Sequence, residues 1–434
     1  MLDVSGPGPF GDQPFGDLSA MIEGLLRSLG AAGQLDWDGA RSMAAGIANE
    51  GVSEPNVDPS VRLRIEQFAR VVEMHVEEVT SLPVSTRNGG IHLAPSTRTA
   101  WTAATVDAYR GLFEHLAESI GSSLRRQLDE LDEDDVAEMG EVLPPGLGAD
   151  PQALVAGLRR MMGPMMTTSM AGSTVGHLGS RAFGDYDLPI PRPATADVHL
   201  VVANIDRFGE EWSLPLDDLR MWICLHEVAH HAVLGIPHVA SRMLTLLTEH
   251  ASAFDGGFGE LETVLGDVDM TDPSGMEQIQ RLMSDPEAMF GAIRSTRQRE
   301  LVPHIDALVA AVEGYVDWVL DEITAQLLPS ASMITEAVRR RRVTADQASR
   351  FVERLFGLEL TQPKLDTGSA FIEGVVQRAG TASLRHLWDD PAHLPTPAEI
   401  EAPGLWLARV DPDAAGQLPD VGGVDIPDFP DLDA

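Results

Sequence analysis

The segment most informative about the fold is residues 214–235, which read LPLDDLRMWICLHEVAHHAVLG. Both of its ends carry helix signals: Ser213 is a candidate N-cap, Pro215 suits a first turn, and Gly235 suits a stop. Between these signals nearly every position is apolar. Because a helix that is apolar on all sides is a buried one, the stretch predicts a helix at the centre of the molecule. The single cysteine of the chain, Cys224, is then a buried thiol with no disulfide partner.

The middle of this helix is polar. His226 and His230 are four residues apart, which places them one turn from each other on the same helix face, and Glu227 lies between them. This is the HExxH pattern, in which two imidazoles bind zinc and the glutamate serves a metal-bound water as general base. The alternative is that the two histidines only satisfy buried hydrogen-bonding partners. The position of the motif in a buried helix favours zinc.

A catalytic zinc site takes three protein ligands, and the motif supplies two. His238 does not stand where the metzincin pattern requires its third histidine. Glu249 follows the second histidine of the motif by nineteen residues (249 − 230), a spacing close to that of thermolysin-like gluzincins. Glu313 stands one helical turn before Asp317, so the glutamate can bind zinc while the aspartate orients a ligand histidine through its free ring N–H. Gly314 then permits a close approach of this helix to the metal site.

The 434-residue chain is strongly acidic, with a formal net charge of −36 and a single lysine. Such a charge disfavours nucleic acid and anionic membranes as partners. No secretory signal is visible, and no stretch approaches the roughly 18 continuous apolar residues of a membrane span. The expected location is therefore the cytoplasm. The arginine run at 339–342 is interpreted as a set of local salt-bridge partners rather than as a nucleic-acid site.

Composition divides the chain into three segments. Residues 1–17 are rich in Gly, Pro and Asp, and residues 411–434 contain acids and no base, so both are predicted to be disordered. Residues 18–410 are expected to form one large domain with a helical N-terminal part (18–170), a metal-site core (171–330) and a C-terminal helical part that ends in an irregular arm (331–410). Apolar spacing predicts further helices at 17–29, 37–48, 58–81, 101–122, 151–170, 238–254, 276–301, 300–328, 345–356 and 368–379.

Strand signals are few. Residues 91–93 follow a turn signal, and residues 198–205 are β-branched between polar neighbours. The second segment is the candidate for an edge strand that pairs with an extended substrate. The Pro-rich segment 185–193 is interpreted as an extended linker or surface brace. The predicted fold class is therefore mainly α, with a small β-sheet next to the HExxH helix.

Six segments together resemble the actinobacterial zincin-like family called "zinc-dependent metalloprotease / putative hydrolase". They are Val201–Phe208, Trp222–His230, Glu313–Asp317, Phe356–Leu360, Ala370–Val376 and Leu394–Glu399. The resemblance spans residues 35 to about 410. It implies a mostly helical zincin-like fold, with His226, His230 and Glu313 as zinc ligands and Glu227 as catalytic base. It implies no substrate, and it gives His231 and His238 no role.

These observations predict a zinc-dependent metallopeptidase-like hydrolase, in which Glu227 activates a zinc-bound water for attack on a peptide or amide carbonyl. The partner is then a peptide or protein substrate. The stabiliser of the resulting oxyanion is left open among Tyr315, His231 and Tyr186. One alternative is a non-catalytic zincin-like scaffold or partner-binding protein that keeps zinc for structure. A hydrolase of a non-peptide amide or ester is a third possibility.

Overall fold

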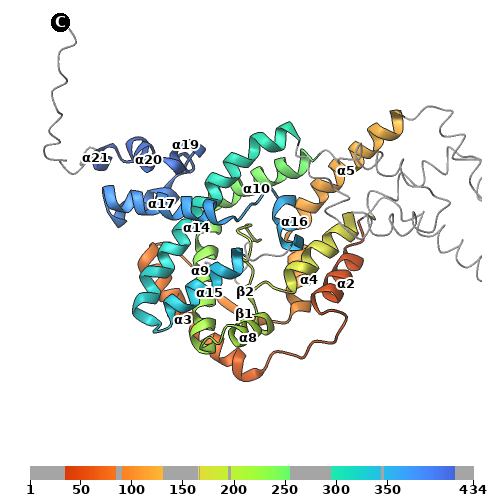
Figure 1. Cartoon of the computed structure of the whole chain (residues 1–434), viewed down its shortest axis with the longest axis horizontal. Helices are drawn as coiled ribbons and strands as arrows, with labels where there is room; N and C mark the ends of the chain where they lie inside the picture. The colour runs from red at the N-terminus through yellow and green to blue at the C-terminus, as the bar shows by residue number, and fades with distance from the viewer. Residues whose placement is uncertain are drawn as a thin grey trace, which may run out of the picture.

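Helix α9 (Leu216–Leu234) lies in the middle of the computed structural model, with other helices around it (Figure 1). The structure describes residues 35–84, 90–130, 165, 167–193, 197–254, 295–343 and 347–415. As the apolar sequence predicts, α9 is buried on nearly all sides, Cys224 included. Gly235 ends the helix by donating its backbone N–H to the His231 carbonyl. The start differs from the prediction, because Ser213 sits in a left-handed turn (φ 52°) and Pro215 is the N-cap.

The helices that pack on α9 come from distant parts of the chain. They are α3 (Pro59–Thr80), α8 (Val202–Glu211), α10 (Pro237–Ser252), α14 (Thr296–Leu327) and α15 (Ala331–Val343). Local signals fix two of the starts. Asp58 caps α3 by accepting the Ser60 N–H at 2.7 Å, as predicted, and Ser295 forms a capping box with Gln298 at the start of α14. These helices enclose the polar centre of α9.

Helices α14 and α17 (Gln362–Ala379) cross with their backbones almost in contact. A Cβ atom added to Gly314 would lie 2.4 Å from the carbonyl carbon of Gly368, and one added to Gly368 would lie 2.2 Å from the carbonyl oxygen of Ala310. Only glycine allows such a crossing. The prediction that Gly314 brings its helix close to the metal site is therefore wrong about the partner, which is α17.

The sheet has two parallel strands, β1 (His92–Ser96) and β2 (Asp197–Val201), paired in the register His92 with Asp197. Both strands are predicted, but the second is shorter than expected because α8 begins at Val202. The far edge of β2 is covered. Val201 donates its N–H to the Phe183 carbonyl at 2.8 Å, and Gly184 forms an antiparallel bridge with Leu200. The prediction of an edge free to pair with substrate is wrong at this side of β2.

The remaining elements cover the outside of this core (Figure 1). The C-terminal arm, predicted to be irregular, is mostly short helices. A tryptophan anchors it as expected, because the Trp406 indole N–H donates to the His393 carbonyl at 2.6 Å. The elements are α2 (Trp37–Ala48), α4 (Arg98–Ala108), α5 (Arg110–Glu130), residues 167–179, α16 (Gln347–Leu355), α18 (His386–Asp389), α19 (Pro397–Glu401), α20 (Pro403–Val410) and α21 (Pro412–Ala415), with 3-10 turns at Thr381–Arg385 and Pro391–His393.

The predicted fold class, mainly α with a small sheet beside the central helix, is confirmed. Predictions for 1–17, 17–29 and most of 151–170, 276–301 and 411–434 lie outside the described residues. Within the described ranges, none of the helices is both long and apolar enough to span a membrane.

Candidate functional site

The imidazole rings of His226 and His230 lie side by side in the buried centre of α9, with their centroids 4.4 Å apart. Nδ1 of His230 lies 3.0 Å from the carbonyl oxygen of His226, and Nδ1 of His226 lies 3.1 Å from Oε1 of Glu227. Both neighbours of Nδ1 can accept a hydrogen bond, so these contacts favour the tautomer with the proton on Nδ1. The lone pair of each ring is then on Nε2, and this is the tautomer in which a histidine binds metal through Nε2.

Glu313 reaches this pair from α14 and stands 83 residues after His230 in the chain. Its Oε1 lies 3.2 Å from Nε2 of His230, and both side chains are buried. Burial alone would raise the pKa of Glu313, but the positive charge of Arg342 and the contact with His230 hold it below its usual range. An ionised carboxylate therefore faces Nε2 of His230. Two acceptors at this distance need a proton or a cation to hold them together.

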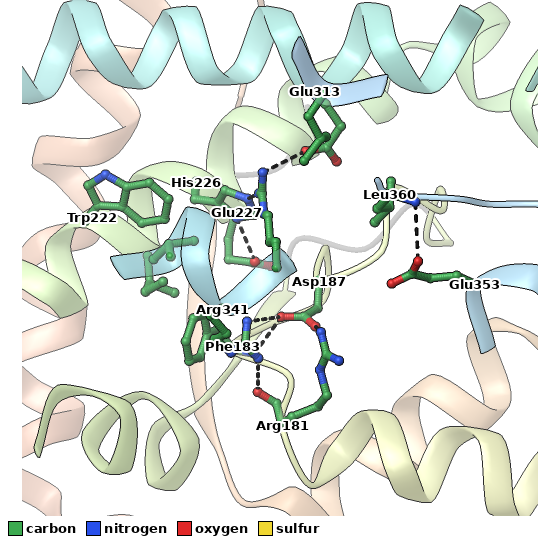
Figure 2. Close-up of a pocket in the computed structure, with 14 residues that line it drawn as sticks. Arg181, Phe183, Asp187, Trp222, His226, Glu227, Glu313, Arg341, Glu353 and Leu360 are labelled. Atoms are coloured by element: carbon green, nitrogen blue, oxygen red, sulfur yellow. Dashed lines mark hydrogen bonds and ion pairs between the residues drawn. The ribbon is translucent and has the colours of Figure 1, made fainter. Parts of the chain in front are cut away.

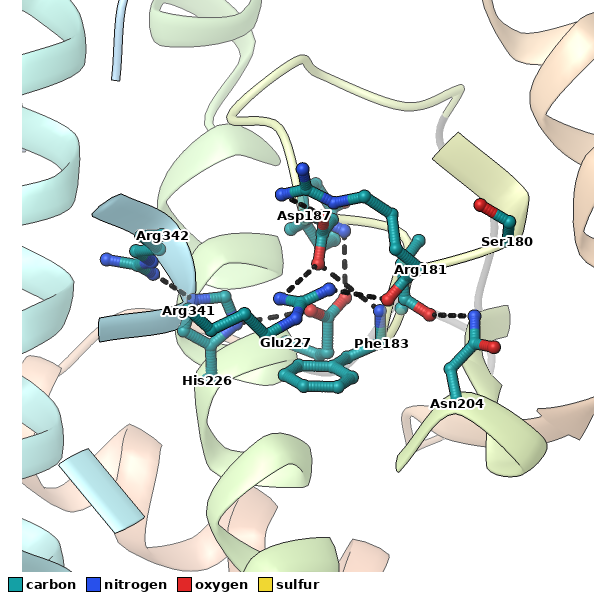
Figure 3. Close-up of polar contacts among 12 residues, drawn as sticks. Ser180, Arg181, Phe183, Asp187, Asn204, His226, Glu227, Arg341 and Arg342 are labelled. Carbon is teal, nitrogen blue, oxygen red and sulfur yellow. Dashed lines mark hydrogen bonds and ion pairs between the residues drawn. The ribbon is translucent and has the colours of Figure 1, made fainter. Parts of the chain in front are cut away.

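Arg342, on α15, places a positive charge between the two predicted ligands. One guanidinium nitrogen lies 2.9 Å from Nε2 of His226 (Figure 3). Another lies 3.4 Å from Oε2 of Glu313. The interpretation of the arginine run as salt-bridge partners is confirmed, since Arg340 pairs with Glu336 at 2.6 Å. No local pattern in the sequence indicates that this run ends at the histidine pair.

Two imidazole nitrogens and a carboxylate are the donors of many catalytic zinc sites. In the described part of the chain, no three His, Cys, Asp or Glu side chains converge on a single point suited to an ion, and Nε2 of His226 faces Arg342 instead. The donor types are nevertheless those that a divalent cation binds, with Glu313 held ionised, and His226 and Glu313 already meet around one positive charge. The residues present fit a metal ion.

Glu227 is completely buried beside the two histidines. Its Oε2 accepts the backbone N–H of Tyr186 at 2.8 Å, and burial raises the pKa of its carboxyl well above the usual range. A carboxylate with a raised pKa is a better proton acceptor near neutral pH. Gly184 makes the room for it, because a Cβ atom at that position would lie 2.4 Å from Cδ of Glu227. Hence a backbone amide and a glycine hold this carboxylate in place.

The segment that carries Gly184 and Tyr186 is not the linker or surface brace that the sequence predicts. Most of residues 182–191 are buried, and ion pairs fix them on both sides of Tyr186. Asp185 contacts Arg192 at 3.4 Å and His199 at 3.0 Å, and Asp187 contacts Arg341 at 3.4 Å. The two aspartates thereby set the position of the amide that binds the Glu227 carboxylate.

The ion pair of His199 with Asp185 gives the fold a measurable pH dependence. Its hydrogen bond to Asp185 raises the pKa of His199 above 6.5, so this pair stabilises the fold fully below that pH and is lost as the pH rises through the raised value. Burial opposes ionisation of Asp185, but Arg192 and His199 lower its pKa overall, so its own contribution is lost only in acid.

We therefore expect His199→Gln to remove part of the stability loss between about pH 5.5 and about pH 9, on the order of 1 kcal/mol. Urea denaturation of both proteins at the two pH values measures this difference. His115→Gln, at an exposed histidine of α5, is the control and should leave the pH dependence of the native protein unchanged. Identical pH dependence for His199→Gln and the native protein would contradict the assigned pair.

Other residues singled out in the sequence lie elsewhere. Glu249, the other candidate for third ligand, pairs with Arg297 at 2.7 Å on the surface. Asp317 lies one turn from Glu313, but within the described residues it hydrogen-bonds to neither histidine. Tyr315 points away from the site, because its ring packs edge-on against Trp388. None of these side chains contacts the histidine pair.

Two of the candidate oxyanion stabilisers lie close to the site but contact each other. The hydroxyl of Tyr186 lies 2.9 Å from Nδ1 of His231, and the ring of Tyr186 stacks on that of His230 with their centroids 6.0 Å apart. His238 lies in the first turn of α10 and hydrogen-bonds to no residue of the site in the described part of the chain. Tyr186 therefore acts on the site through its backbone N–H and its ring face.

A pocket opens beside these groups (Figure 2). His226, Glu227 and Glu313 line it together with Arg341 and Arg342. Apolar side chains complete the wall, among them Trp222, Ile223, Val338 and Leu360. Two of the predicted ligands, His226 and Glu313, and the predicted base therefore share one cavity, whose wall combines charged and apolar side chains.

Comparison with known proteins shows the family of the chain. A family model described as zincin-like metallopeptidase matches residues 35–407. No curated protein matches. A crystal structure from Chloroflexus aurantiacus, described as a "putative hydrolase with a novel fold", is similar, with a TM-score of 0.53 at 20% identity over 87% of this chain and 99% of that one. At this identity the likeness shows the fold alone. Because the family model covers most of its length, the chain belongs to the zincin-like metallopeptidases.

Proposed function

We propose that this protein is a zinc-dependent metallopeptidase-like hydrolase that cleaves a peptide or amide bond. His226, His230 and Glu313 would hold the metal, and Glu227 would be the catalytic base. The observation that supports this assignment is the approach of Glu313 to His230 at 3.2 Å across 83 residues of chain, beside the pocket that Glu313 lines together with His226 and Glu227. A glutamate that only stabilised the fold would not have to meet a histidine of the motif.

Glu227 is placed for proton transfer in this reaction. A bound zinc would supply Lewis acidity, which polarises a carbonyl and lowers the pKa of water. The Tyr186 amide holds Oε2 of Glu227, and Oε1 lies beside the imidazole of His226. The carboxylate can thus take a proton from the attacking water and deliver it to the nitrogen of the leaving amine.

Metal analysis and peptide digestion test the proposal together. The purified protein is expected to hold one zinc per chain, and to cleave members of a peptide library in an assay read by mass spectrometry. A chelator should stop cleavage, and added zinc should restore it. His230→Ala should lose both metal and cleavage, whereas His115→Ala, at an exposed histidine of α5, should keep both. A native protein that binds zinc through four protein ligands and cleaves nothing would instead be a structural zinc protein.

Gly184→Ala is expected to lower the rate of hydrolysis by about a hundredfold while the protein still binds metal. The added Cβ would lie 2.5 Å from Oε2 of Glu227, so the carboxylate must leave the position set by the Tyr186 amide. Steady-state rates and zinc affinity of the variant measure the two effects separately. The control is Gly46→Ala on α2, where a Cβ meets nothing within 4 Å. Full activity in Gly184→Ala would contradict the role given to this contact.

A further inference from the structure

Arg342 occupies the lone pair that a metal ion would use on His226. A guanidinium can only donate hydrogen bonds, so Nε2 of His226, 2.9 Å away, is the acceptor in this contact. The nitrogen has one lone pair and cannot serve both the arginine and a metal. The same guanidinium pairs with Oε2 of Glu313 at 3.4 Å. Arg342 thus contacts two of the three proposed ligands at once.

We propose that Arg342 is an internal cation that competes with the metal for His226 and Glu313, and that Asp317 takes up its guanidinium when the metal is bound. The inference rests on the proposed metal site. A guanidinium and a divalent cation repel each other strongly at contact distance in a buried site, so the arginine must leave when the metal enters. Without metal it keeps the buried lone pair of His226 and the charge of Glu313 satisfied.

Asp317 is placed to receive the displaced side chain. It lies one helical turn beyond Glu313 on α14 and is largely buried. A turn rises about 5.4 Å, a distance that the long arginine side chain can cover by changing rotamer. In the described part of the chain, Asp317 makes no close ion pair and accepts no side-chain hydrogen bond. Burial raises its pKa overall, and the positive charges of Arg342 and Arg339 oppose this rise. This largely buried carboxylate therefore has two guanidinium groups nearby but a direct hydrogen bond to neither of them.

The other carboxylates that act on Arg342 already have partners. Asp187 pairs with Arg341 at 3.4 Å, and Glu227 accepts the Tyr186 N–H at 2.8 Å. Glu313 is itself one of the proposed ligands. Asp317 is therefore the acceptor left for the guanidinium once the metal has taken His226 and Glu313. This gives Asp317 a role through Arg342 instead of through a histidine.

Zinc affinity, measured by competition with a chromophoric chelator, tests the competition directly. Because the arginine-bound state must open before metal can enter, Arg342→Gln is expected to bind zinc roughly tenfold more tightly than the native protein. Arg340→Gln is the matched control, since Arg340 lies on the same helix and pairs with the exposed Glu336. Its affinity should stay within about twofold. Unchanged or weaker binding in Arg342→Gln would overturn the proposal.

A double-mutant cycle tests whether Asp317 takes up the Arg342 guanidinium when metal binds, and it does not depend on Arg342→Gln alone. Asp317→Asn is expected to weaken zinc binding by roughly tenfold in the native background and to have little effect when Arg342 is already glutamine. Equal effects in both backgrounds would show that Asp317 acts on the metal directly, and they would exclude its role as acceptor of the displaced Arg342 guanidinium. If no variant binds zinc, the proposed function fails as well. If native protein and Arg342→Gln bind zinc equally, only the competition fails.

Discussion

Glu227→Gln is expected to lower the rate of hydrolysis by at least about a hundredfold while zinc content and fold are unchanged. Glutamine has nearly the shape of glutamate and can still accept the Tyr186 N–H, which lies 2.8 Å from Oε2, so the buried packing survives. It cannot take a proton, however, and the proposed reaction needs one to move from water to the leaving amine. Rates on a peptide selected from the library, together with zinc stoichiometry, measure the two properties separately.

Glu249→Gln is the matched control for this substitution. Glu249 is a half-exposed glutamate that pairs with Arg297 on the surface, so its loss should leave rate and metal content unchanged. A Glu227→Gln protein that retains the native rate would remove the base from the mechanism. A protein that loses its zinc would show that Glu227 acts on metal binding instead.

Gly314→Ala is expected to destabilise the protein by about 3 kcal/mol, near the upper end for overpacking. The added methyl group would lie 2.4 Å from the carbonyl carbon and oxygen of Gly368, and both contacts are with backbone atoms that no rotamer change can move. Helices α14 and α17 would have to separate. Because Glu313 is the neighbouring residue, we also expect weaker zinc binding. Chemical denaturation and chelator competition measure the two effects.

Gly46→Ala on α2 separates the steric effect from helix propensity. A Cβ at Gly46 meets nothing within 4 Å, so alanine there should stabilise the helix by up to about 1 kcal/mol. The two substitutions are the same chemically and should act with opposite sign. If Gly314→Ala proves neutral, the crossing of α14 and α17 is not as close as described.

Helices could be predicted where the sequence carries a local pattern. Helix α2 has the predicted bounds, and α3 has the predicted cap at Asp58, because spacing and caps depend on a few neighbouring residues. Helix α9 was predicted from its apolar composition. The predicted N-cap of α9, Ser213, lies two residues before the observed one, Pro215. Ser213 instead adopts a left-handed backbone conformation that no local rule anticipates. The division of the chain into domains stays a prediction.

Contacts between distant segments could not be predicted in the same way. The prolines of residues 185–193 predict a linker or surface brace, yet the ion pairs of Asp185 and Asp187 and the Tyr186–Glu227 hydrogen bond hold most of this segment in the buried interior beside α9. The sequence predicts that Arg342 takes part in a salt bridge, which is confirmed, but it does not predict the contact of Arg342 with His226. Both errors have one cause: periodicity reports which face of an element is apolar, and it does not report which partner a charge meets.

The covered edge of β2 bears on what the pocket can select. Proteases that extend a sheet with their substrate read the peptide backbone itself, but here the N–H groups of His199 and Val201 already donate to residues 183–185. A substrate therefore gains nothing at this edge from having a regular backbone. Methylating the amide nitrogens on either side of the scissile bond should cost little affinity, and compounds with a single cleavable amide or ester should be accepted alongside peptides. Discrimination would then come from the groups next to the bond that is cut.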